Sequence, residues 1–282
     1  MPVQELEQVS RPGDRVLTIC QVGDPAGRPA FYFHGTGGSR LEVAAYDKAA
    51  TEYGVRLICW DRPGTGGSTG QPGRTMLDVV GDTHAVAGTL GIPDASVIGL
   101  SGGGSHVLVL AATAPGIVRR AIAINPGPPS LDEILARLEP KLAKSIALAR
   151  DRPKAFALVS ELSQIQGGKI GAALRKRGAD PTDVSVVYDP AVRPLFEASA
   201  REGRAQARAF TNEALVIWHR PWGVDLDSFP VPVDVFAGST DPFRPFGEQL
   251  AAAGATLHTF PGGHLSGFAP EVLEQIMAIA AG

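Results

Sequence analysis

The chain has 282 residues, of which 44% are hydrophobic and 20% charged, and its 26 basic and 29 acidic residues give a formal net charge of -3. This composition excludes a disordered chain, and the balanced charge offers no basic surface for nucleic acid. No apolar run approaches the ~18 residues of a membrane span, and the N-terminal residues do not resemble a signal peptide. We therefore expect a cytoplasmic protein that binds neither nucleic acid nor membranes, with Cys20 and Cys59 as buried thiols.

Strand-like and helix-like segments alternate along the chain. Short apolar or alternating runs predict strands at 15–22, 30–33, 55–60, 95–100, 120–124, 233–237 and 255–260. Helical spacing predicts helices at 40–53, 75–90, 105–114, 246–253 and 270–281. Strands that alternate with helices in this way predict an α/β protein, with a parallel sheet covered by helices on both faces.

The segment 127–229 interrupts this alternation, because it contains helical stretches and no convincing strand. We interpret it as a helical lid, or cap, inserted into a core made of residues 1–126 and 230–282.

The pattern G-x-S-x-G occurs twice, at 99–103 and at 66–70. In a nucleophile elbow, this pattern places a serine on a strained turn between a strand and a helix. Ser101 follows a predicted strand and precedes a predicted helix, whereas Ser68 lies among glycines and prolines that favour a loop. We therefore predict that Ser101 is a nucleophile.

A serine hydroxyl needs a neutral imidazole to accept its proton and a carboxylate to orient that imidazole. Of the six histidines, His264 lies in a loop that leaves a predicted strand, although it could also begin the last helix. Asp241 also follows a strand, although an Asp followed by Pro is a good helix cap as well. The order Ser101, Asp241, His264 is that of one hydrolase fold, and we predict these three as the catalytic residues.

The negative oxygen of a tetrahedral intermediate requires backbone N–H donors. Gly102, directly after the nucleophile, can supply one of them. Thr36, in the loop 34–38 that follows a strand, is predicted to supply the second, with Gly35 allowing the chain to turn close to the site. We expect His34 to brace this loop. The glycines match neither a dinucleotide-binding nor a phosphate-binding pattern.

Five motifs in this order resemble those of the α/β-hydrolase family. They are the oxyanion loop at 34–38, the D-R-P-G-x-G-x-S turn at 61–68, the elbow at 99–103, the acid turn at 238–241 and the histidine motif at 262–264. The resemblance covers the chain except the lid. It implies an α/β-hydrolase fold: a mostly parallel eight-stranded sheet flanked by helices, with the first strands antiparallel and the lid inserted after the sixth strand. It also implies that Ser68 belongs to a structural turn.

The leading interpretation is a serine hydrolase that cleaves a small-molecule carboxylic ester, lactone or thioester through an acyl-enzyme on Ser101. This chemistry needs no metal and no organic cofactor. Lyase or cofactor-free perhydrolase chemistry on the same residues, and a receptor-like protein that only binds a ligand, remain alternatives. Candidates for substrate contact are Gly35, Trp218, Trp222 and Phe210, although aromatic residues of a lid often serve packing. The sequence carries no signal of oligomeric state.

Overall fold

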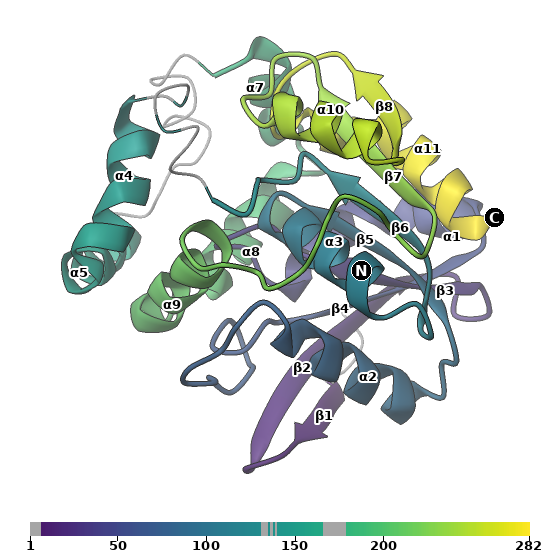
Figure 1. Cartoon of the computed structure of the whole chain (residues 1–282), viewed down its shortest axis with the longest axis horizontal. Coiled ribbons are helices and arrows are strands. Elements are labelled where there is room, and N and C mark those ends of the chain that lie inside the picture. Colours follow the sequence, from purple (N-terminus) through teal and green to yellow (C-terminus); the bar gives the residue numbers. More distant parts are fainter. Residues whose placement is uncertain (1–6, 131–134, 136–137, 139, 166–178) are drawn as a thin grey trace.

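An eight-stranded sheet forms the centre of the molecule (Figure 1). The computed structural model describes residues 7–282 apart from 131–134, 136–137, 139 and 166–178. The strands are β1 (Glu7–Arg11), β2 (Arg15–Gly23), β3 (Arg28–Phe33), β4 (Val55–Trp60), β5 (Ala95–Leu100), β6 (Val118–Ile124), β7 (Val233–Gly238) and β8 (Thr256–Phe260).

The strands lie in the order β1-β2-β4-β3-β5-β6-β7-β8. β2 runs antiparallel to both β1 and β4, whereas β3 to β8 all run in one direction. This arrangement confirms the predicted fold class. Because the strands from β3 onward are parallel, the loops that follow them emerge at one edge of the sheet, where ligands bind in folds of this kind.

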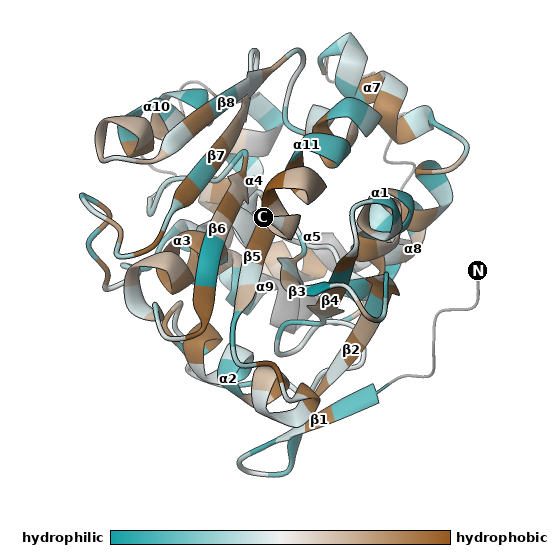
Figure 2. Ribbon diagram, turned by 90° about the vertical axis from the view of Figure 1, so that its right-hand side faces the viewer, coloured by the Kyte–Doolittle hydropathy of each residue, from teal (hydrophilic) through white to brown (hydrophobic). Residues whose placement is uncertain are grey.

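Helices cover both faces of the sheet. One face packs against α2 (Asp78–Leu90), α3 (Gly102–Thr113) and α10 (Arg244–Ala252), and the other against the 3₁₀ helix η1 (Arg40–Tyr46), α1 (Asp47–Glu52) and α11 (Pro270–Ala281). In β3, Phe31 and Phe33 join the first core cluster and Tyr32 joins the second, because side chains alternate along a strand. Hydrophobic residues accordingly lie along much of the central strands (Figure 2).

Residues 127–229, which we interpreted as an inserted lid and call the insertion below, lie between β6 and β7. Its described part contains no strand, and its helices are α4 (Pro140–Asp151), α5 (Pro153–Ile165), α7 (Pro181–Tyr188), α8 (Arg193–Arg204) and α9 (Ala207–Trp218). α4 and α5 pack against each other and against α9, at the side of the molecule farthest from the sheet (Figure 1). By contrast, α8 packs on η1, and α7 packs on the 3₁₀ helix η3 (Ser266–Phe268). Within the described ranges, no helix is both long and apolar enough to span a bilayer.

Four of the five predicted helices have other boundaries in the structure, and one of them, predicted at 246–253, is α10 at Arg244–Ala252. The segment predicted as one helix at 40–53 is divided into η1 and α1, and the helix predicted from residue 75 begins at Asp78. The helix predicted from residue 105 begins at Gly102. Packing explains this early start, because a Cβ on Gly103 would lie 1.9 Å from the carbonyl oxygen of Phe33. The close approach of α3 to β3 thus outweighs the low helix propensity of glycine.

Cys20 and Cys59 are both buried free thiols, as predicted. They lie opposite each other in the antiparallel register of β2 and β4. Burial raises the pKa of Cys20 to about 11, and it also raises the pKa of Cys59. Both side chains are therefore neutral at physiological pH.

Candidate active site

Ser101 occupies a sharp turn between β5 and α3. Its φ of 56° and ψ of -122° are unfavourable for a residue with a side chain. A conformation of this kind costs about 1–3 kcal/mol and persists only where the surrounding structure enforces it. Here the backbone N–H of Ser101 donates to the carbonyl of Ile124 at 2.8 Å, which ties the turn to the end of β6. Ser101 directly follows the end of β5, at the edge of the sheet, and is only partly buried.

The glycines around Ser101 make this turn possible. A Cβ on Gly99 would lie 2.5 Å from the carbonyl carbon of Gly103, and a Cβ on Gly102 would lie 2.1 Å from Thr36 Oγ1. At Gly99 a side chain would meet backbone atoms, so this position requires glycine, and at Gly102 a side chain would force Thr36 to shift. The G-x-S-G-G sequence thus brings the start of α3 against the oxyanion loop as well as against the sheet.

Asp241 and His264 form a hydrogen bond of 2.6 Å between Oδ2 and Nδ1. The aspartate side chain is 0% exposed and the imidazole is 27% exposed, so the carboxylate lies beneath the ring and the ring reaches solvent. The other carboxylate oxygen, Oδ1, accepts the N–H of Phe243 at 2.6 Å. Asp241 therefore stabilises its own turn and orients the imidazole at the same time. It does not cap α10, the alternative role, because that helix begins at Arg244 with Phe243 as its N-cap residue.

The environment of His264 favours a protonated imidazole. Burial alone would lower the pKa of His264, but the negative charge of Asp241 and its hydrogen bond outweigh that effect. Asp183 and Glu42 act in the same direction, and the pKa is raised above its usual value of 6.5. A ring held in this way binds a proton more strongly than a free imidazole.

Asn125 connects the residues that carry this pair. Its Nδ2 donates to the carbonyl oxygens of His264 at 2.9 Å and Gly263 at 3.3 Å, and its Oδ1 accepts the N–H of Gly238 at 2.8 Å. Asn125 has a φ of 45°, a conformation that asparagine tolerates better than most residues. It therefore links the end of β6 to the histidine loop (residues 261–266) and to the end of β7.

The oxyanion loop approaches Gly102 through Thr36. Among the described turn and loop hydrogen bonds between backbone groups, none is donated by the N–H of Thr36 or by the N–H of Gly102. Thr36 Oγ1 is buried and has no hydrogen-bond partner among the described residues. The structure thus brings together the two residues predicted to supply the oxyanion donors.

Polar side chains hold the oxyanion loop from both sides. Glu42 Oε1 accepts the N–H of Gly35 at 3.0 Å and the hydroxyl of Tyr32 at 2.7 Å, and burial raises the pKa of Glu42. His34 Nδ1 lies 2.9 Å from the carbonyl of Gly35, and burial lowers the pKa of His34 well below its usual value. His34 is therefore neutral, and it contacts the loop as we expected.

Arg62 reaches the same loop from the turn after β4. Its Nη1 donates to the carbonyl of His34 at 2.5 Å and its Nη2 to that of Gly35 at 3.1 Å, while its Nε pairs with Glu213 of α9. The Arg62 and Glu213 side chains are only 2% and 6% exposed. This buried ion pair connects the insertion to the oxyanion loop.

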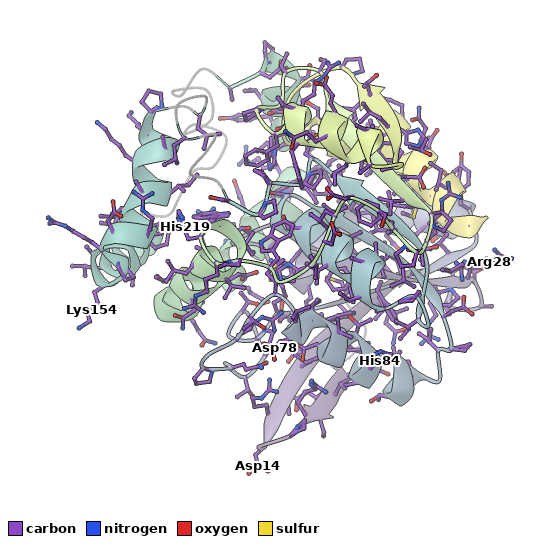
Figure 3. The ribbon with its side chains drawn as sticks, viewed as in Figure 1. Asp14, Arg28, Asp78, His84, Lys154 and His219 are labelled. Carbon is purple, nitrogen blue, oxygen red and sulfur yellow. The ribbon has the colours of Figure 1, made fainter. Side chains whose placement is uncertain are left out.

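Neither Ser101 nor Asp241 is hydrogen-bonded to any of the other four histidines in the described part of the chain. His84 is exposed on α2, and His219 lies at the end of α9, with Nε2 3.1 Å from the carbonyl of Ile146 (Figure 3). His106 Nδ1 lies 2.8 Å from the carbonyl of Gly102 in its own helix, and His258 Nε2 lies 2.8 Å from Asp234. Within the described residues, no hydrogen bond joins the Ser101 hydroxyl to His264, and such bonds often tighten only when substrate binds.

Ser68, the second match to the elbow pattern, has a structural environment. Its hydroxyl donates to the carbonyl of Asp61 at 2.7 Å and accepts the N–H of Thr18 at 2.9 Å. The residue is 3% exposed. Both hydrogen bonds support the turn assigned to it by the family resemblance.

The aromatic residues suggested as substrate contacts occupy different positions. Trp222 is buried in the core, and its indole N–H donates to the carbonyl of Ile217 at 3.1 Å, which favours a packing role. Trp218 is half-buried and packs against the small clusters that include α4 and α5 residues. The side chain of Phe210 lies outside the described part of the structure.

A cavity of about 630 Å³ between α9 and the turn after β4 is lined by Arg62, Glu213, Val216 and Arg220, among others. It therefore lies beside the arginine that holds the oxyanion loop.

Three supporting residues were not found from the sequence as site residues. Asn125 was considered only as a position where an acid could have stood, while Glu42 and Asp183 had no recognisable signal. Asp183 contacts Ser266, 83 residues away, and Glu42 contacts Gly35, seven residues away, without any motif that announces the contact. In the described part of the chain, no group of three or more His, Cys, Asp or Glu side chains is arranged to hold a metal ion.

Comparisons with known proteins agree with the observed fold. Residues 30–276 match the model of the alpha/beta hydrolase family. Among solved structures, the chain is similar to an enol-lactonase from Burkholderia xenovorans LB400, with 20% identity, 97% of each chain covered and a TM-score of 0.64. It is also similar to a structure from a study of carboxylesterases of Nitrososphaera gargenis, with 21% identity, 98% of each chain covered and a TM-score of 0.67. A proline iminopeptidase from Mycobacterium smegmatis has 24% identity and a TM-score of 0.67, with 98% of this chain and 96% of that one covered. The family match covers most of the sequence, and the chain belongs to the alpha/beta hydrolase family.

Proposed function

We propose that this protein is a serine hydrolase that cleaves a carboxylic ester, a lactone or a thioester of a small molecule through an acyl-enzyme on Ser101. The observation that carries the proposal is the hydrogen-bonded Asp241–His264 pair, at the same sheet edge as the strained turn of Ser101. An enol-lactonase and carboxylesterases among the similar proteins fit this substrate class.

In the proposed reaction His264 transfers one proton in each of the two steps: the serine proton to the leaving group in acylation, and a water proton to Ser101 in deacylation. Because Nδ1 of His264 is bound to Asp241, Nε2 is the nitrogen that accepts the proton when Ser101 Oγ attacks the carbonyl carbon. The bond to the leaving oxygen or sulfur then breaks, and the leaving group takes the proton from Nε2. Water next attacks the acyl-enzyme, giving its proton to Nε2, which returns it to Ser101 as the acid product leaves.

Two backbone donors stabilise the negative oxygen formed in each addition. In this proposal they are the N–H groups of Thr36 and Gly102, whose side chain and Cα lie in close contact. Removal of one such donor in other hydrolases costs roughly 3–4 kcal/mol of transition-state stabilisation. The bracing of the oxyanion loop by Glu42 and Arg62 supports this assignment, because a rigid loop keeps the donor aimed.

The helical insertion is proposed to act as a lid that bounds the substrate site. Ile217 of α9 supports this role, since its Cδ1 would lie 3.0 Å from a Cβ on Gly102. Ser199 of α8 adds a second contact, because its hydroxyl accepts the N–H of Ser39 at 2.8 Å. On this proposal Gly35 and Trp218 remain candidates for substrate contact.

Ser101→Ala tests the proposal directly. The purified protein is incubated with a fluorophosphonate probe and, separately, with p-nitrophenyl esters from acetyl to dodecanoyl. We expect the substitution to abolish both labelling and turnover, because it removes the attacking oxygen. Ser68→Ala is the matched control, since it changes the other G-x-S-x-G serine, and it should keep labelling. Persistent labelling of the Ser101→Ala protein would contradict the assignment.

A further inference from the structure

Helix α7 of the insertion contacts both loops that carry the candidate acid and base. At its N-terminus, Asp180 Oδ2 accepts the hydroxyl of Thr240 at 2.7 Å, next to Asp241. One turn further, Asp183 Oδ1 accepts three hydrogen bonds from the histidine loop: from the N–H of Leu265 at 3.0 Å, and from the N–H and the hydroxyl of Ser266 at 2.8 and 2.6 Å. The two residues directly after His264 are thus bound to one carboxylate.

The contact between Asp183 and the histidine loop is close-packed. A Cβ on Gly263 would lie 2.5 Å from Asp183 Oδ2 and 3.2 Å from Asp180 Cβ. The hydroxyl of Ser266 also accepts the N–H of Gly263 at 3.1 Å, so Asp183 supports that residue through Ser266. Glycine before His264 therefore allows the loop to lie directly against α7.

Helix capping does not explain Asp183. The N-terminus of α7 is capped by Asp180, whose Oδ1 accepts the N–H of Thr182 at 2.8 Å. Asp183 is 6% exposed, and in the described part of the chain no Lys or Arg side chain forms an ion pair with it. A buried carboxylate of this kind is costly unless hydrogen bonds or a positive charge compensate for it. The histidine loop provides the hydrogen bonds, and a protonated imidazole provides the charge.

We propose that Asp183 is a positioning residue for His264: it fixes the backbone that carries the imidazole and supplies, from the insertion, a second negative charge that stabilises the imidazolium. This inference rests on the proposed function. The charged groups that face His264 are Asp241 from the loop after β7, Asp183 from α7 and Glu42 from η1, and all three raise the pKa of His264 against the opposing effect of burial.

Two variants separate the charge from the support. Asp183→Asn keeps an oxygen that can accept from the loop but removes the charge, whereas Asp183→Ala removes the acceptor. Asp189, at the other end of α7, is the matched control, because it is exposed and its side chain accepts only the N–H of Ala191 among the described contacts. The corresponding variants are Asp189→Asn and Asp189→Ala.

The first measurement is the pH dependence of kcat/KM for a p-nitrophenyl ester, whose acidic limb reports the base of the free enzyme. We expect Asp183→Asn to move this limb to lower pH by about 0.5 unit, because one negative charge near the imidazole is lost. Asp183→Ala should lower kcat by about tenfold or more with KM changed less than about threefold, since a loosened imidazole slows chemistry more than binding. The Asp189 variants should match the unsubstituted protein in both respects.

The second measurement does not depend on turnover. The imidazole signals of His264 are titrated by NMR in the unsubstituted protein and in the Asp183→Asn and Asp189→Asn variants, with His264→Gln used to assign the signals. A lower pKa in Asp183→Asn alone supports the inference, and equal values in all three proteins overturn it. Inactivity of the unsubstituted protein toward every ester would instead count against the proposed function, and the NMR titration would still decide the role of Asp183.

Discussion

The buried ion pair between Arg62 and Glu213 allows a quantitative test of how the insertion supports the oxyanion loop. Glu213→Gln replaces a carboxylate that is 6% exposed with a neutral amide, and it leaves the Arg62 guanidinium, 2% exposed, without a counter-charge. Removal of one partner of a buried ion pair typically costs about 3–5 kcal/mol of folding free energy. We expect a value near the lower end, about 3 kcal/mol, because glutamine keeps an oxygen acceptor and Arg62 keeps its two backbone carbonyls.

Equilibrium urea unfolding at pH 7, followed by tryptophan fluorescence, measures this cost. With a denaturant slope of about 3 kcal/mol/M, the midpoint should fall by roughly 1 M. The matched control is Glu248→Gln, which breaks the exposed Arg244–Glu248 pair on α10, with side chains 36% and 52% exposed. An exposed pair contributes less than about 1 kcal/mol, so its midpoint should hardly change. Equal midpoints for the two variants would refute the reasoning from burial. If the protein is active, kcat/KM should also fall for Glu213→Gln but not for Glu248→Gln. The reason is that Arg62 holds the carbonyls of His34 and Gly35 in the oxyanion loop.

Two further predictions concern acidity and packing. The pKa of His264 is raised above 6.5, and a protonated imidazole cannot accept the serine proton. We therefore expect kcat/KM to fall as the pH decreases through a value above 6.5. An acidic limb centred below pH 6 would contradict this. Gly103→Ala should lower the melting temperature by roughly 5–10 °C, because the added Cβ would lie 1.9 Å from the Phe33 carbonyl oxygen. Gly88→Ala on α2 is the control. A Cβ there meets nothing within 4 Å, so this substitution should raise the melting temperature slightly. Similar melting temperatures for the two variants would show that the contact at Gly103 is not restrictive.

The sequence was sufficient for the parts of the fold that depend on local patterns. Apolar runs located the central strands. Gly91 and Pro115 marked the ends of two helices, and in the structure α2 ends at Leu90 and α3 at Thr113. Ser101, Asp241 and His264 were selected because each follows a strand, and parallel strands bring the residues that follow them to one edge. The hydrogen bond between Asp241 and His264 is the direct outcome of that topology.

Tertiary packing decided the features that local patterns missed. Gly102 and Gly103 are poor helix formers, yet they begin α3, because a Cβ on Gly103 would collide with the backbone of β3 and one on Gly102 would collide with the Thr36 side chain. Likewise, no spacing rule connects Asp183 with Ser266, because their contact depends on how the insertion folds back on the sheet. Trp222, which the sequence offered as a candidate for substrate contact, is buried in the core, and this position also depends on tertiary packing.

The uneven attachment of the insertion has a consequence for how substrate preference can change. α7 and α8 are bound through Asp183 and Ser199 to the segments that contain His264 and Ser39, while α4 and α5 pack on each other and on α9, and α5 also contacts α8. We therefore expect substitutions in α4 and α5 to disturb those segments less than substitutions at Asp183 or Ser199. For protein engineering, α4 and α5 are then the first part of the insertion to exchange when a different substrate preference is sought.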